Sequence, residues 1–143
     1  LRSLMRLKHV YLSSPSESPG FTDESLTILS RLPELEHLGI EGGRFSAAGI
    51  AQLKANERLS FLRIRCRKVD TKQRHEVAAG LGELSQVKHL SITLGPLDEE
   101  SLAKLARLKF LKRLELAEKD IDAAAARRLQ SHLPGTEVAR LNQ

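Results

Sequence analysis

The segment LEHLGI at residues 35–40 decides the fold, because variants of it recur along the chain of 143 residues. Each copy follows the pattern L-x-x-L-x-L, in which valine or isoleucine can replace leucine. Successive copies start 28, 24, 28 and 24 residues apart: LKHVYL (7–12), LEHLGI (35–40), LSFLRI (59–64), VKHLSI (87–92) and LKRLEL (111–116). We predict a sixth, degenerate copy at LPGTEV (133–138), which starts 22 residues after the fifth.

The interval between copies has a pattern of its own. Each copy is followed by an apolar residue and then by a side chain that can accept hydrogen bonds from the free amides at a helix start. Apolar residues at helical spacing come next, such as Leu102, Leu105 and Leu108. Each unit is therefore predicted to form a strand, a turn and a capped helix. The predicted N-caps are Thr22, Ser46, Asp70, Asp98 and Asp122.

A single strand–helix unit cannot bury its apolar faces, whereas a stack of such units buries them between neighbours. The sequence therefore predicts an open α/β solenoid of five to six strand–helix units, in a single domain over residues 1–143. The parallel sheet would form the concave face and the helices the convex face. We assign the four additional residues of the two longer units to turns, at SSPSESPG (13–20) and in the stretch 68–76.

This pattern resembles the leucine-rich repeat family over nearly the whole chain. The segments LGIEGGRFSAAGIAQL (38–53) and LELAEKDIDAAAARRL (114–129) are most similar to the short α/β repeats of bacterial members, related to the ribonuclease-inhibitor-like class. The buried Asn of many such repeats is absent from the corresponding positions. The resemblance implies a curved, non-catalytic surface that binds other macromolecules. An alternative is that this domain is the substrate-recognition part of a larger ligase adaptor or effector protein.

The start of the chain leads to a separate expectation. Leu1, Leu4 and Leu7 continue the leucine spacing that precedes the other strands, and a repeat array exposes its apolar interior at an unprotected end. We therefore expect the chain to be the C-terminal part of a longer protein, or this end to be covered by a partner or by self-association with a second copy.

Residues that alternate with the leucines of each strand are predicted to face the concave surface. They form ladders across the sheet, one of them Tyr11, Gly39, Arg63, Ser91 and Glu115, continuing with Glu137. The centre combines a phenylalanine with arginines and flanking histidines, a composition typical of binding hot spots. The predicted partner-binding residues are Tyr11, His37, Phe61, Arg63, Arg65, His89 and Arg113. The alternative is an ordinary solvated face, in which Arg65 pairs with Glu41 on the adjacent strand.

Positive charge is concentrated in one segment. The net charge is +5, and the segment RIRCRKVDTKQR at 63–74 holds six basic residues and one acidic residue, so the rest of the chain is neutral. We expect an acidic protein partner, whose approach would be steered by Arg67, Lys68, Lys72 and Arg74. The alternative partner is a nucleic acid or another polyanion, for which charge confined to one repeat is a poor match.

Sequence patterns for metal and phosphate sites are incomplete. His9, His37 and His89 share a predicted ladder, but no cysteine or acidic residue completes a set of four metal ligands. The glycines of the segment 39–43 are not followed by the Lys-Ser/Thr pair of a phosphate loop. We therefore predict no bound metal and no cofactor.

Enzymatic and membrane functions are also disfavoured. Cys66 adjoins Arg65 and Arg67, which would lower the pKa of its thiol, but no oriented base accompanies it. No apolar run approaches the roughly 20 residues that a transmembrane helix needs. We therefore predict a non-catalytic protein that binds another protein and has no membrane partner.

Overall fold

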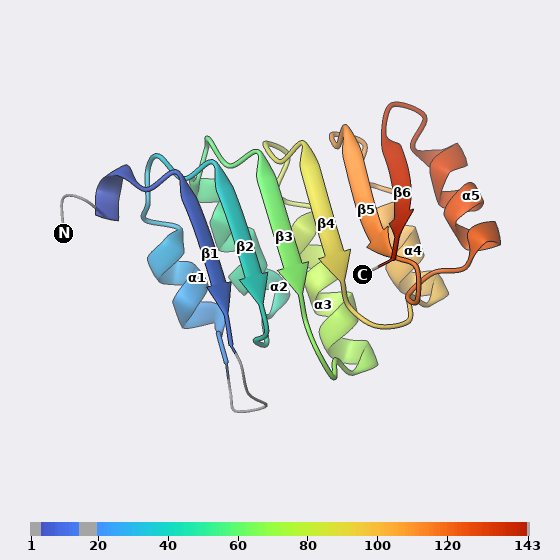
Figure 1. Ribbon diagram of the computed structural model, residues 1–143, viewed down its shortest axis with the longest axis horizontal. Coiled ribbons are helices and arrows are strands. Elements are labelled where there is room, and N and C mark those ends of the chain that lie inside the picture. The colour runs from blue at the N-terminus through green and yellow to red at the C-terminus, as the bar shows by residue number, and fades with distance from the viewer. Residues whose placement is uncertain (1–3, 15–19, 143) are drawn as a thin grey trace.

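Six parallel strands form one open sheet in the computed structural model, which describes residues 4–14 and 20–142 (Figure 1). The strands lie side by side in chain order, and each pairs in register with the next. They are β1 (His9–Ser13), β2 (His37–Glu41), β3 (Phe61–Arg65), β4 (His89–Thr93), β5 (Arg113–Ala117) and β6 (Glu137–Leu141).

The helices cover one side of the sheet and leave the other side uncovered (Figure 1). They are α1 (Asp23–Leu29), α2 (Ala47–Ala51), α3 (Thr71–Leu81), α4 (Glu99–Leu105) and α5 (Ala123–His132), with 3-10 turns η1 (Leu4–Arg6) and η2 (Gln52–Ala55). The predicted α/β solenoid of strand–helix units is confirmed. None of the helices in the described ranges is long and apolar enough to cross a membrane.

The core lies between the sheet and the helices and consists of stacked aliphatic layers. Leu38, Leu62, Leu90 and Leu114 pair in register across four strands, and each is at most 2% exposed. Burial of one such side chain stabilises the fold by about 1.5–3 kcal/mol. The strand leucines of every repeat therefore contribute to one continuous core rather than to separate cores.

Most of the predicted helix caps are confirmed by their hydrogen bonds. Ser46, Asp70, Asp98 and Asp122 each accept a bond from the backbone amide three residues further on. At Thr22 the backbone amide donates to the hydroxyl of Ser25 instead. The caps fix the point at which each chain segment turns from the sheet into a helix.

The placement of four extra residues in a turn of the third unit was wrong. Asp70 follows β3 at the same interval at which Ser46 follows β2, so this turn has the ordinary length. The additional residues lengthen α3, which has 11 residues whereas α4 has 7. Four residues make about one helical turn. Of the other predicted insertion, SSPSESPG, residues 15–19 lie outside the described residues.

The predicted start of the sixth copy was wrong by two residues. Arg113 pairs with Glu137 and Leu114 with Val138, so the sixth copy begins at residue 135, 24 residues after the fifth. Leu133 is buried but belongs to the turn that follows α5, and this apolar residue misled the alignment. Glu137 consequently continues the ladder of Arg113, whereas Ala139 lies beside Glu115.

Polar side chains tie each unit to the one before it. The amide of the buried Asn56 donates to the carbonyls of Leu29 and Leu32, both at 3.0 Å. The hydroxyl of Thr136 donates to the carbonyl of Leu111 at 2.6 Å. The bonds of Asn56 satisfy carbonyls at and just beyond the end of α1, which a helix leaves without internal partners, and the bond of Thr136 satisfies a carbonyl just before β5.

Candidate binding face

The uncovered side of the sheet, called here the open face, carries a continuous row of rings. His9, His37, Phe61 and His89 occupy the same position on β1 to β4. Their ring centroids lie 4.4, 5.4 and 4.6 Å apart along the row. His9 and His37 are stacked, His37 and Phe61 are tilted, and Phe61 and His89 meet edge to face. The imidazole rings carry hydrogen-bonding nitrogens on their edges, so the row combines aromatic carbon with polar groups. We call these four residues the aromatic row.

Glu115 organises the β4–β5 side of the open face. Its nearly buried carboxylate contacts His89 Nε2 and Arg113 Nε, both at 2.9 Å. Burial alone would raise the pKa of Glu115, but the bonds from His89 and Arg113 outweigh it and hold that pKa below its ordinary value. Arg113 also contacts Glu137 at 2.7 Å. The structure thus places His89 and Arg113 on the predicted face but engages both in internal ion pairs.

Glu41 organises the opposite side of the face. The hydroxyl of the exposed Tyr11 donates to one oxygen of Glu41, and Arg67 contacts the other, both at 2.7 Å. These bonds hold the pKa of Glu41 below its ordinary value, and the bond to Glu41 raises the pKa of Tyr11. The partner of Glu41 is thus Arg67 rather than Arg65. Arg65 makes no hydrogen bond or ion pair with another of the described residues.

Arg63 lies at the centre of the open face, between Gly39 and Ser91. The ring of Tyr11 fills the space above Gly39, since a Cβ atom there would lie 2.6 Å from Tyr11 Cδ2. Arg63 is therefore half-buried, and its Nε has no hydrogen-bond partner in the described part of the chain. The small size of Gly39 therefore does not leave Arg63 fully exposed, because the ring of Tyr11 occupies the space beside it.

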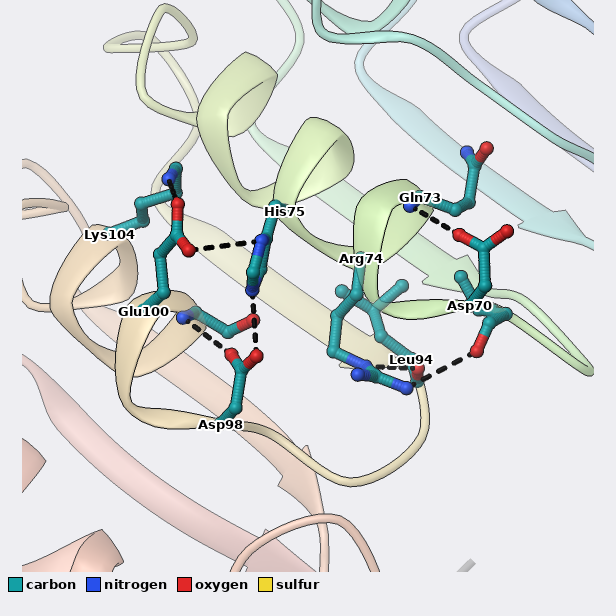
Figure 2. A network of polar contacts seen from close by, with 10 residues as sticks. Asp70, Gln73, Arg74, His75, Leu94, Asp98, Glu100 and Lys104 are labelled. Carbon is teal, nitrogen blue, oxygen red and sulfur yellow. Dashed lines mark hydrogen bonds and ion pairs between the residues drawn. The ribbon is translucent and has the colours of Figure 1, made fainter.

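Three of the four predicted steering residues lie in solvent, and the fourth does not. Arg67, Lys68 and Lys72 are exposed. Arg74 is only 8% exposed, and its guanidinium donates to the carbonyls of Leu94 and Val69 at 3.0 and 3.2 Å (Figure 2). The steering role predicted for Arg74 was therefore wrong, because this side chain connects two loops inside the fold.

Cys66 also differs from its expectation. Its thiol is buried, and burial raises its pKa to about 12. The predicted lowering of the thiol pKa by the adjacent arginines was wrong because desolvation of the thiolate outweighs their charge.

Within the described ranges, no group of His, Cys, Asp and Glu side chains could hold a metal ion.

A polar cluster between α3 and α4 was not predicted. His75 contacts Asp98 at 2.7 Å through Nε2 and Glu100 at 3.2 Å through Nδ1, and Lys104 binds Glu100 at 2.9 Å (Figure 2). The sequence identifies Asp98 as a cap but carries no signal that His75, 23 residues earlier, lies beside it. The cluster joins neighbouring helices on the side away from the open face.

Replacement of Asp98 by alanine is expected to cost about 1 kcal/mol of stability at pH 6, the typical value of an N-cap. Bonds from the Ser101 amide and then from His75 hold the pKa of Asp98 well below its ordinary value. A lowered pKa in the folded state stabilises the protein above pH 4 or so, and this contribution disappears as the pH falls through the folded-state pKa.

Urea unfolding between pH 6 and pH 2 would measure this contribution. The difference in the free energy of unfolding between the wild type and Asp98→Ala should become smaller on acidification. Asp98→Asn keeps an acceptor at the cap position, so it isolates the effect of the charge. A gap that stays constant over this pH range would contradict the expected role of the carboxylate.

The fold and the open face agree with the architecture that the resemblance to leucine-rich repeats implies: parallel strands in chain order alternate with helices on one side, and the other side is left open. No protein-family model and no curated protein matches the sequence. Among solved structures, the chain is similar to a leucine-rich repeat protein of Leptospira interrogans, with a TM-score of 0.48 and 23% sequence identity. The match covers 78% of this chain and 27% of that one, so this chain spans about a quarter of that structure.

Proposed function

We propose that the chain is a non-catalytic interaction module whose open face binds an acidic segment of a protein partner. One observation carries this proposal: the open face bears the aromatic row beside two arginines of β3, Arg63 and Arg65, neither of which has an ion-pair partner among the described residues. A surface of this kind offers apolar contact and charge complementarity together.

The balance of charge on the face favours an acidic partner. The three carboxylates within its strands, Glu41, Glu115 and Glu137, are all engaged by cationic, imidazole or hydroxyl groups. Arg63 and Arg65 of β3 make no ion pair with another described residue, although the charge of Arg65 contributes to the lowered pKa of Glu41. A guanidinium has a planar fork of donors that matches a carboxylate through two hydrogen bonds.

The nucleic-acid alternative has less support. Single-stranded nucleic acids are bound by stacking bases on open ring faces. In the aromatic row, Phe61 is in ring contact with His37 on one side and with His89 on the other, which limits the room for a base to stack on it. The alternative in which this domain recognises substrates for a larger adaptor or effector would use the same open face.

Replacement of both Arg63 and Arg65 by alanine is expected to weaken partner binding at least tenfold, because two charge-assisted contacts are lost. The fold should be unaffected, since both side chains point away from the core. Partners captured from nuclease-treated lysates by the wild type would be identified, and their affinity for both proteins measured with purified components.

Arg107→Ala with Lys109→Ala is the matched control, because it removes two exposed cations that follow α4. Equal binding by the wild type and the Arg63/Arg65 variant would place the interface on the helices or loops. Partners that bind only before nuclease treatment would favour the nucleic-acid alternative.

A further inference from the structure

A basic cavity lies at the edge of the sheet where the strands end. It has a volume of about 240 Å³ and is lined by four cations, one carboxylate and a threonine: Arg65, Arg67, Lys68, Lys119, Glu41 and Thr93. Because all strands are parallel, their carboxyl ends and the loops that follow lie along one edge of the sheet (Figure 1). Lys119 thus reaches the cavity from the loop after β5, although the other cations come from β3 and the loop that follows it.

The cations of the cavity differ in how they are paired. Glu41, its one carboxylate, is already bound by Arg67 and by the hydroxyl of Tyr11. Arg65 and Lys119 make no ion pair with any of the described residues. Cys66 also lines the cavity, but its raised pKa keeps it a neutral thiol. Arg65 lies near enough to Glu41 to lower the pKa of that carboxyl, and an anion bound in the cavity would be attracted by both Arg65 and Lys119.

We propose that this cavity binds the phosphomonoester group of a phosphorylated side chain, presented by the protein partner that the open face is proposed to bind. This inference rests on the proposed function and names the chemistry of the partner. The cavity adjoins the open face through Arg65 and Glu41, which are the last residues of β3 and β2. A segment bound across the strands could therefore place a side chain in it.

A phosphomonoester matches the cavity better than a carboxylate. It carries a charge of about −1.5 to −2 at neutral pH and has three acceptor oxygens, which suits a cavity lined by Arg65, Arg67 and Lys119. Clusters of arginine are a recurring means of recognising phosphorylated motifs. A nucleic-acid backbone is a poorer match, because its charges are spread along a chain whereas the excess charge of this protein lies in one segment.

The proposal can be tested on the isolated chain with small probes, by following backbone amide NMR shifts at constant ionic strength. Inorganic phosphate and O-phosphoserine should shift the amides of the loops after β3 and β5 at millimolar concentrations. Glutamate and serine should bind at least tenfold more weakly. Equal binding of glutamate and phosphoserine, or no shift with either phosphate probe, would overturn the proposal.

Matched variants assign the binding to the cavity. Arg65→Gln with Lys119→Gln should weaken phosphoserine binding at least tenfold, whereas Arg107→Gln with Lys109→Gln should not. Glu41→Gln should tighten binding, because it removes the one carboxylate. An equal loss of phosphoserine binding in the Arg107→Gln, Lys109→Gln control would show general attraction to a basic protein and would overturn the proposal. Thermal unfolding of each variant verifies that it is folded.

Two further outcomes separate this proposal from the proposed function. Tighter binding of an oligonucleotide that has no terminal phosphate than of phosphoserine would overturn the assignment to a phosphorylated protein. Because Arg65 belongs to both sites, Arg63→Ala alone tests the face: if phosphoserine binds in the cavity but captured proteins bind equally well to Arg63→Ala, the cavity proposal is supported and the role of Arg63 in the open face is contradicted. If binding of a partner depends on the open face but is unchanged after phosphatase treatment of that partner, the proposed function is supported and the phosphate assignment of the cavity is contradicted.

Discussion

Replacement of Leu62 by alanine is expected to lower the free energy of unfolding by about 3–5 kcal/mol, the upper part of the range for leucine truncation in a core. Leu62 is completely buried on β3 and lies in register between Leu38 and Leu90. Both neighbours are fixed by strand pairing, so they cannot move together to fill the space. Since domains of this size are stable by about 5–15 kcal/mol, a large part of the stability would be lost.

Urea unfolding followed by circular dichroism would measure this loss. The matched control is Leu4→Ala, which truncates the same side chain where it is half exposed, and its cost should stay near or below about 0.5 kcal/mol. Similar costs for the two variants would mean that the stacked layers do not form one packed core.

Replacement of Arg74 by alanine is expected to cost about 3 kcal/mol, although sequence reasoning placed this arginine on the surface. The variant leaves the carbonyls of Leu94 and Val69 without their hydrogen-bond donors. It also loses the packing of the long aliphatic part of the arginine side chain. It would loosen the connection between the loops that follow β3 and β4. Affinity for an acidic partner should change only to the extent that the folded fraction changes.

Lys72→Ala is the matched control, because Lys72 lies on the same helix with its side chain in solvent. Its effect on thermal stability should be small, and its effect on association should depend on salt. A stable Arg74→Ala variant with slower, salt-dependent association would restore the steering role that the structure argues against.

The repeat could be predicted from the sequence because it depends on local pattern. Leucine spacing places the strands, and the caps at Ser46, Asp70, Asp98 and Asp122 mark the helix starts, as the hydrogen bonds confirm. The ladder order follows from strand register, and β1 to β5 pair as expected. The errors lie where an apolar residue has two possible positions, as Leu133 does, or where extra length can enter a helix instead of a turn.

The candidate site was less predictable, because charge and burial are set by neighbours distant in sequence. Pattern alone places Arg74 among exposed cations, but its depth depends on how the loops after β3 and β4 meet. The thiol of Cys66 shows the same effect, since burial outweighs the adjacent arginines. The contribution of Lys119 to the basic cavity has no sequence signal, because Lys119 follows a strand that lies two positions from β3.

The longer α3 helix restricts how this repeat array can change during evolution. An α-helix rotates by about 100° per residue, so four inserted residues make slightly more than one revolution and return the apolar side chains to the sheet. One or two inserted residues would rotate the apolar side of the helix away from the sheet and bring charged side chains toward the core. Insertions and deletions in the helical layer should therefore survive selection in steps of about one turn, whereas the loops along the sheet edge can gain or lose single residues.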